Sequence, residues 1–88
     1  MYAIAGALYS WDNASQRFEA LDWGPAYNAS NNEVKEIEDF LADVGITDIC
    51  VVPVHHNGYW YMVIQPLSED TRNMMLLTYE TQLFSPNR

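Results

Sequence analysis

An α+β fold is the class that the sequence predicts, a two-layer sandwich in which a helix lies across an antiparallel sheet of about four strands. Three observations lead to it. Short runs of β-branched and aromatic residues are joined by clusters of turn formers, one amphipathic helical segment lies between two such pairs, and 49% of the 88 residues are hydrophobic. A chain of this length builds one modest core. We therefore expect a single domain over residues 1–88, with the element order ββαββ and then a helix.

The first two strands are predicted to form a hairpin. Residues 2–11 and 17–23 are rich in aliphatic and aromatic side chains, and the five residues between them, Asp12-Asn13-Ala14-Ser15-Gln16, favour a turn. Gly24-Pro25 then ends the pairing.

A helix is predicted from a capping box to a glycine. In Ser30-Asn31-Asn32-Glu33 the Ser30 hydroxyl would accept a hydrogen bond from the third helical amide, and Glu33 would reach back to the amide of Ser30. Gly45 suits the left-handed conformation in which many helices end. Apolar residues recur between these signals at helical spacing: Val34, Ile37, Phe40, Leu41 and Val44.

A second hairpin is predicted around Asn57-Gly58, a dipeptide that suits a two-residue type I′ turn. This turn fixes the register of the two strands. One face then carries the pairs His56 with Tyr59, Val54 with Tyr61, Val52 with Val63 and Cys50 with Gln65. The other face is more apolar and is expected to pack on the helix; it carries the pairs His55 with Trp60, Pro53 with Met62 and Val51 with Ile64. The first face is left to the last segment or to a partner.

The last segment is predicted as a helix, with a strand as the alternative. Ser68-Glu69-Asp70 has the capping side chain and first-turn acids of a helix start. Leu76, Tyr79 and Leu83 would share one face of that helix. Thr78, Tyr79 and Thr81 would serve a strand equally well, and so few residues leave both open over residues 69–84.

The charged residues are strongly unbalanced. Twelve are Asp or Glu and four are Lys or Arg, which gives a formal net charge of −8 at pH 7. An aromatic content of 14% indicates a packed acidic domain rather than a disordered acidic tail. Binding to nucleic acid requires many Lys and Arg residues, so we expect no direct contact with DNA or RNA. The charge favours a basic macromolecular partner.

No pattern of residues predicts catalysis or a metal site. Cys50 and His56 would share one face of a strand but stand about 20 Å apart at about 3.3 Å per residue, and His55 would face the other side. We interpret these three as a buried structural cysteine and two histidines at a hairpin end. Carboxylates on the outer face of the helix have no cleft to hold a substrate. We therefore expect no enzymatic activity, no cofactor and no metal.

The sequence further predicts a cytoplasmic protein without a membrane segment. Residues 1–11 lack a basic leader, and their apolar run is shorter than the about 20 residues that span a bilayer. The single cysteine cannot form an intramolecular disulfide, which fits a reducing compartment.

The predicted binding site has an acidic and an aromatic part. Acidic side chains on the helix would attract Lys and Arg of a partner, and aromatic side chains would supply the desolvated anchors. The acidic residues are Glu33, Glu36, Asp39 and Asp43, and the aromatic ones are Tyr59, Tyr61, Trp60 and Trp23. A solubilising acidic helix face is the simpler interpretation of the first group.

In length, acidity, aromatic content and lack of catalytic motifs, the chain is similar to the small inhibitors that bacteriophages and mobile elements use against host defence. These include anti-CRISPR and anti-restriction proteins and DNA mimics. The resemblance lies in composition and carries no residue over to this chain. It implies a non-enzymatic inhibitor, in the host cytoplasm if phage-encoded, that covers a basic surface of a bacterial protein or ribonucleoprotein.

Two other functions remain open. One is a homodimeric structural or interaction module, joined through the uncovered sheet face or the edge of the first strand. The other is a small-ligand sensor that uses the aromatic hairpin face as a pocket wall.

Overall fold

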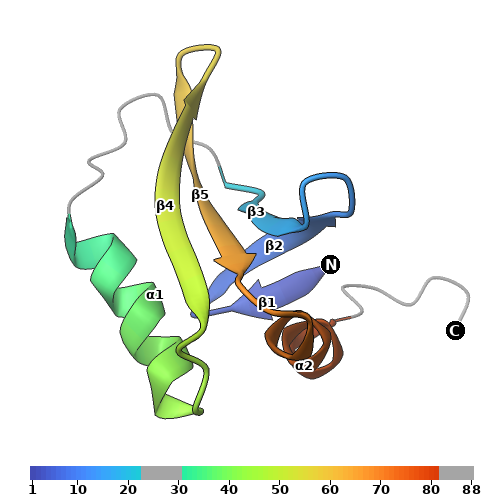
Figure 1. The fold of residues 1–88 in the computed structure, drawn as a ribbon. Helices are drawn as coiled ribbons and strands as arrows, with labels where there is room; N and C mark the ends of the chain where they lie inside the picture. The colour runs from blue at the N-terminus through green and yellow to red at the C-terminus, as the bar shows by residue number, and fades with distance from the viewer. Residues whose placement is uncertain (23–30, 82–88) are drawn as a thin grey trace, which may run out of the picture.

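The computed structural model describes residues 1–22 and 31–81, which form a five-stranded antiparallel sheet with two helices (Figure 1). The elements are β1 (Tyr2–Ile4), β2 (Ala7–Asp12), β3 (Arg17–Ala20), α1 (Asn31–Asp43), β4 (Ile49–His56), β5 (Tyr59–Pro66) and α2 (Glu69–Tyr79). The strand order is β1-β2-β3-β5-β4, so α1 connects β3 to β4 and β5 later fills the place between them. The predicted α+β class is confirmed.

The fifth strand arises because the first predicted strand is divided in two. Ala5 and Gly6 have φ angles of 53° and 82°, and this tight turn folds β1 back on β2 with Ile4 opposite Ala7. A single strand over residues 2–11 is therefore wrong. The turn escapes sequence reasoning because alanine rarely adopts a positive φ, so an Ala-Gly pair between apolar residues is a weak turn signal.

The turn between β2 and β3 is held by Asp12. Asp12 pairs with Arg17, so the turn itself is one residue shorter than expected. The Asp12 carboxylate accepts hydrogen bonds from the Ser15 hydroxyl and the Ala14 amide, and these bonds lower its pKa from the usual value. The sequence therefore marks this turn correctly through an aspartate, whose side chain accepts a hydrogen bond from the backbone amide two residues later.

The second hairpin has the predicted register throughout. Asn57 and Gly58 have φ angles of 52° and 81°, as a type I′ turn requires, and His56 pairs with Tyr59. All seven predicted pairs are present.

Helix α1 covers the predicted face of this hairpin. Val51 and Ile64 on that face are buried, and so are Ile37 and Leu41 of the helix. The predicted burial of Cys50 is wrong, since the side chain is exposed. It points to the opposite face of an edge strand, away from α1.

The C-terminus of α1 is a Schellman motif. The Ile46 amide donates to the Leu41 carbonyl at 2.8 Å and the Gly45 amide donates to the Ala42 carbonyl at 2.9 Å, with Gly45 at a φ of 86°. Ile46 is buried beside the helix end, whereas Val44, predicted to join the buried stripe, is 57% exposed. Because the chain leaves the helix at Gly45, Ile46 and not Val44 is the apolar residue that is buried at this end of α1.

The last segment is a helix that ends in a strand-like contact. Ser68 caps α2 and accepts a hydrogen bond from the Thr71 amide at 3.2 Å. Met75 and Thr71 are buried, while Tyr79 is half-buried. Beyond the helix, Glu80 forms an antiparallel bridge with Tyr2. Of the predicted face, Leu76 and Tyr79 pack against the core, and Leu83 lies outside the described residues.

We predict that Ile37→Asp prevents stable folding, whereas Val44→Asp is tolerated. Ile37 is 8% exposed in the helix–sheet layer, so an unpaired charge there should lower the free energy of unfolding by at least about 3 kcal/mol. Val44 is exposed, and the same change should cost about 1 kcal/mol or less. Urea denaturation followed by circular dichroism measures both. Equal losses would contradict the assigned buried face of α1.

A second prediction concerns Tyr79, whose hydroxyl is buried without a hydrogen-bond partner among the described residues. Tyr79→Phe keeps the ring, which lies 6.1 Å from the Phe40 ring, and removes the unsatisfied group. The free energy of unfolding should rise by about 1 kcal/mol. A clear destabilisation in chemical denaturation would show that the hydroxyl has a partner.

Candidate functional site

The outer face of α1 carries the predicted acidic residues. Glu33, Glu36, Asp39 and Asp43 are all exposed. At about 100° per residue, the last three fall within about 60° of one another, opposite the buried Leu41. At about 1.5 Å per residue, Glu36 and Asp43 are about 10 Å apart along the axis. Three carboxylates thus share one solvated surface, which we call the acidic face (Glu36, Asp39 and Asp43).

Little positive charge opposes the acidic face. Lys35 pairs with Asp39 at 3.3 Å, and both side chains are more than 60% exposed, so this ion pair contributes little to stability. The last turn of α1 has no basic residue, and Asp43 lies at the negative end of the helix dipole. That position costs about 0.3–1 kcal/mol. No basic side chain in the last turn of α1 therefore offsets the charge of Asp43.

The other described basic residues are also paired. Arg17 lies 2.9 Å from the Glu19 carboxylate, which raises the Arg17 pKa, and Arg72 lies 3.3 Å from Glu69. Neither of these ion pairs involves α1, so they do not neutralise the acidic face.

Glu33 differs from the acidic face because it interacts with the core. Tyr9 is 2% exposed, and its pKa is raised to about 12, first by burial and then by the negative charge of Glu33. Glu33 therefore lies on the side of α1 that approaches the sheet.

The predicted aromatic residues divide into three groups. Tyr59 is exposed at the hairpin tip, and Trp60 is half-buried with its ring stacked on His55 at 4.6 Å. Tyr61 is a core residue whose hydroxyl accepts a hydrogen bond from Arg17 at 3.4 Å, so it is not available as an anchor. Trp23 lies outside the described residues.

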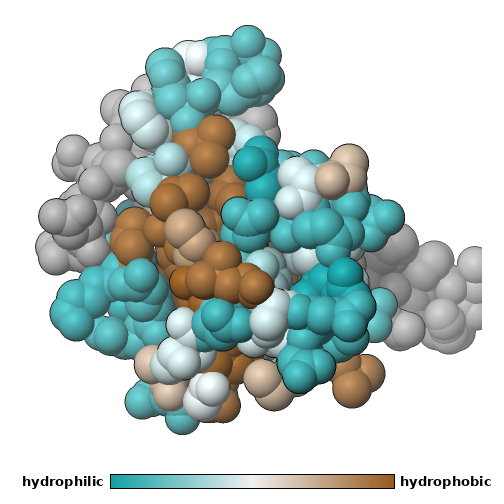
Figure 2. Space-filling model, viewed as in Figure 1, coloured by the Kyte–Doolittle hydropathy of each residue, from teal (hydrophilic) through white to brown (hydrophobic). Residues whose placement is uncertain are grey.

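The structure does not bring the acidic and aromatic groups together. The β4–β5 hairpin projects beyond the rest of the sheet, whereas α1 lies beside the opposite end of β4 (Figure 1). Hydrophobic side chains gather over β4 in the middle of the view, with hydrophilic ones over α1 (Figure 2). A partner that touches both groups must span this apolar region.

Each edge of the sheet carries a feature that limits strand pairing with another chain at one position. At the β1 edge, Tyr2 is bridged to Glu80, and the Thr81 amide donates to the Met1 carbonyl at 2.8 Å. At the β4 edge, ladder alternation from the His56–Tyr59 pair turns the nitrogen of Pro53 outward, and proline has no hydrogen to donate.

Two further features are absent from the residues that the structure describes. Within residues 1–22 and 31–81, no group of three or more His, Cys, Asp or Glu could hold a metal ion. No helix in the same residues is long and apolar enough to cross a membrane.

Comparison with models of protein families, with curated proteins and with solved structures finds no match to this chain. The fold and the site define a small acidic α+β protein with an exposed carboxylate surface on one helix.

We predict that Tyr9 makes the fold sensitive to alkali. A tyrosine pKa of about 12 in the folded state, against about 10 when unfolded, stabilises the fold fully below pH 10. This contribution, on the order of 2–3 kcal/mol, is lost as the pH rises through 12. Urea denaturation between pH 9 and 12 should show a smaller fall for Tyr9→Phe. An equal fall in both proteins would assign the sensitivity to other groups.

Proposed function

We propose that this protein is a small non-enzymatic inhibitor whose acidic face binds a basic, nucleic-acid-contacting surface of another protein. The observation that carries the proposal is the set of three exposed carboxylates on α1, opposed there by a single lysine. A partner surface built to hold phosphates offers Lys and Arg at close spacing. Such a surface is attracted to the acidic face and is then blocked by the body of the domain.

The inhibition would combine electrostatic steering with steric exclusion. Carboxylates on one helical face stand a few ångströms apart along the axis, which is the scale on which phosphates follow one another in a nucleic-acid strand. Of the predicted aromatic residues that the structure describes, Tyr59 and Trp60 at the hairpin tip are accessible for a desolvated contact. Charges at the rim of an interface mainly raise the association rate, and buried aromatic anchors mainly slow dissociation.

The placement of Asp43 favours recognition over simple solubility. A solubilising charge can sit anywhere on the surface, and an acidic residue is best placed near a helix N-terminus. Here the acidic face extends to the C-terminal turn of α1, where a carboxylate is destabilising and no basic side chain offsets it.

The proposed partner is a basic protein or ribonucleoprotein of a bacterial host, met in its cytoplasm. The proposed class is that of phage or mobile-element inhibitors of host defence, and its sharpest form is an anti-CRISPR protein. Composition supports this class, with twelve acidic residues in 88. An anti-restriction protein that mimics DNA would use the same surface.

The proposal predicts that Glu36→Lys, Asp39→Lys and Asp43→Lys together abolish inhibition. Nucleic-acid-binding proteins from bacterial lysates are loaded on a double-stranded DNA resin, and the purified protein is added. The wild type should release a discrete protein from the resin, and the triple variant should bind that protein at least about ten-fold more weakly. Binding should also weaken from 50 to 500 mM salt, as the Debye length falls from about 14 to about 4 Å.

A matched control reverses three exposed acidic residues away from α1 and from the other surfaces assigned to binding: Glu69, Asp70 and Glu80. It changes the net charge by the same amount and should still release the partner. Circular dichroism should show both variants folded. A folded triple variant on α1 that releases the same protein with unchanged affinity would overturn the proposal, as would equal losses in both variants.

A further inference from the structure

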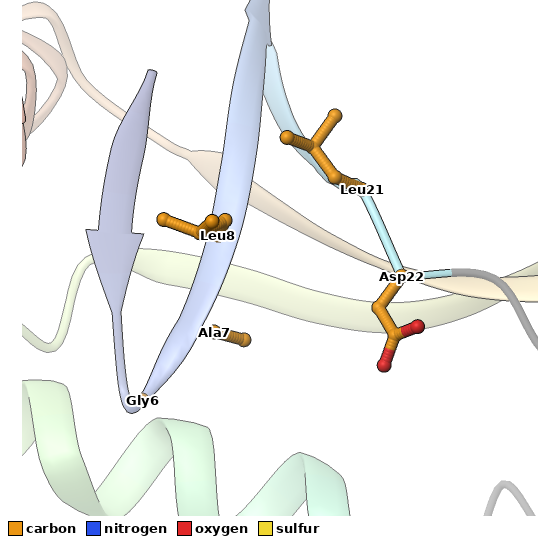
Figure 3. A pocket seen from close by; sticks show the side chains of 5 residues that line it. All are labelled: Gly6, Ala7, Leu8, Leu21 and Asp22. Atoms are coloured by element: carbon orange, nitrogen blue, oxygen red, sulfur yellow. The ribbon is translucent and has the colours of Figure 1, made fainter. Parts of the chain in front are cut away.

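An open pocket lies where the chain leaves β3, beside the turn between β1 and β2 (Figure 3). Its volume is about 360 Å³, and it is lined by Gly6, Ala7, Leu8, Leu21 and Asp22. Figure 3 shows the two leucine side chains toward one end of the pocket and the Asp22 carboxylate toward the other. The pocket therefore has an apolar end and an acidic end.

Strand pairing holds the two leucines side by side. The Leu21 amide donates to the Leu8 carbonyl at 3.0 Å, which extends the β2–β3 ladder one residue beyond the Tyr9–Ala20 pair. Leu8 and Leu21 therefore face each other across neighbouring strands on the same side of the sheet. They are 36% and 45% exposed, so the apolar end is open to solvent.

The turn between β1 and β2 lines one side of the pocket with Gly6, which has no side chain. A Cβ atom built on Gly6 would meet nothing within 4 Å, so this wall is free of side-chain bulk. The room next to Ala7 thus comes from the tight turn that divides β1 from β2.

The acidic end carries a carboxylate without an ion-pair partner among residues 1–22 and 31–81. Asp22 is exposed, and the described basic residues pair with other carboxylates. A cation that reaches the pocket would therefore find a negative group that is not already neutralised by those residues.

We propose that this pocket takes the side chain of a lysine or arginine from a protein partner. Such a side chain has an apolar stem of several methylene groups and a charged head, and it buries the stem while the head remains at a polar rim. The stem would lie on Leu8 and Leu21, and the head would reach Asp22. This inference rests on the proposed function in one respect, the basic character of the partner.

Other occupants match only part of the pocket. A purely apolar side chain would cover the leucines but desolvate the Asp22 carboxylate without a partner for it. A phosphate or another anion would be repelled by Asp22. A small inorganic cation would leave the two leucines exposed to water. An amphipathic cation is the one chemical class that satisfies both ends.

The test is a titration with blocked amino acids, followed by NMR of the ¹⁵N-labelled and methyl-labelled protein. Nα-acetyl-arginine amide and Nα-acetyl-lysine amide should shift the resonances of Leu8, Leu21 and Asp22, with dissociation constants in the millimolar range or weaker. Nα-acetyl-norleucine amide, which has the stem without the charge, should bind about five-fold more weakly. Guanidinium ion, which has the charge without the stem, should also bind more weakly.

Two variants and one control assign the site. Asp22→Asn should weaken arginine binding to the level of norleucine, and Leu21→Ser should weaken both. Asp70→Asn removes an exposed carboxylate elsewhere and should change nothing. Equal binding of arginine and norleucine, no effect of Asp22→Asn, or shifts outside the pocket would each overturn the inference.

The outcome is separable from that of the proposed function. Reversal of Glu36, Asp39 and Asp43 should leave arginine binding in the pocket within about two-fold, because the acidic face is on α1 and not in the pocket lining. If arginine fails to bind while the protein still releases a partner from the DNA resin, the pocket inference fails alone. If arginine binds at Asp22 and no partner is released, the proposed function fails alone.

Discussion

The continuity of the whole sheet depends on the short pairing of β3 with β5, a joint between the three N-terminal strands and the second hairpin. β3 pairs with β5 at only two positions, Phe18 with Ile64 and Glu19 with Val63. On one side of the joint lie β1, β2 and β3, and on the other the long β4–β5 hairpin. Phe18 is fully buried, and its ring contacts those of Tyr2 and Trp11 at centroid distances of 5.2 and 4.8 Å. These ring contacts lie within the β1–β2–β3 unit, and across the joint Phe18 pairs with Ile64, which is also fully buried.

The strand order around this joint also determines which side chains of α1 are exposed on the surface. Because α1 runs from β3 to β4, its inner face must bury Ile37 and Leu41 against the sheet, and its outer face is left to solvent and to the carboxylates. Glu80 and Thr81 pair with the start of the chain at one sheet edge, and Pro53 lies in the strand at the other. In this arrangement the acidic face, the hairpin tip and the pocket beside Asp22 are all open to solvent.

Local signals in the sequence identified the elements that local chemistry controls. Asn57-Gly58 fixed the register of the second hairpin, and Ser68 marked the start of α2 in a segment whose periodicity also allowed a strand. The acidic face followed from helical spacing alone. The turn at Ala5-Gly6 did not follow, because the backbone there adopts positive φ angles that the residue pattern does not demand.

The sequence by itself determined the fold class, the central helix and the charge of its outer face, since each follows from periodicity, capping or composition within one segment. Only the tertiary structure decided which aromatic residues reach the surface: Tyr59 is exposed while Tyr61, on the same face of the same strand, is buried and bound to Arg17. It alone placed Leu8 beside Leu21 and left Asp22 at the end of that pair. Burial and pocket formation depend on contacts between segments far apart in the chain, and no local pattern encodes them.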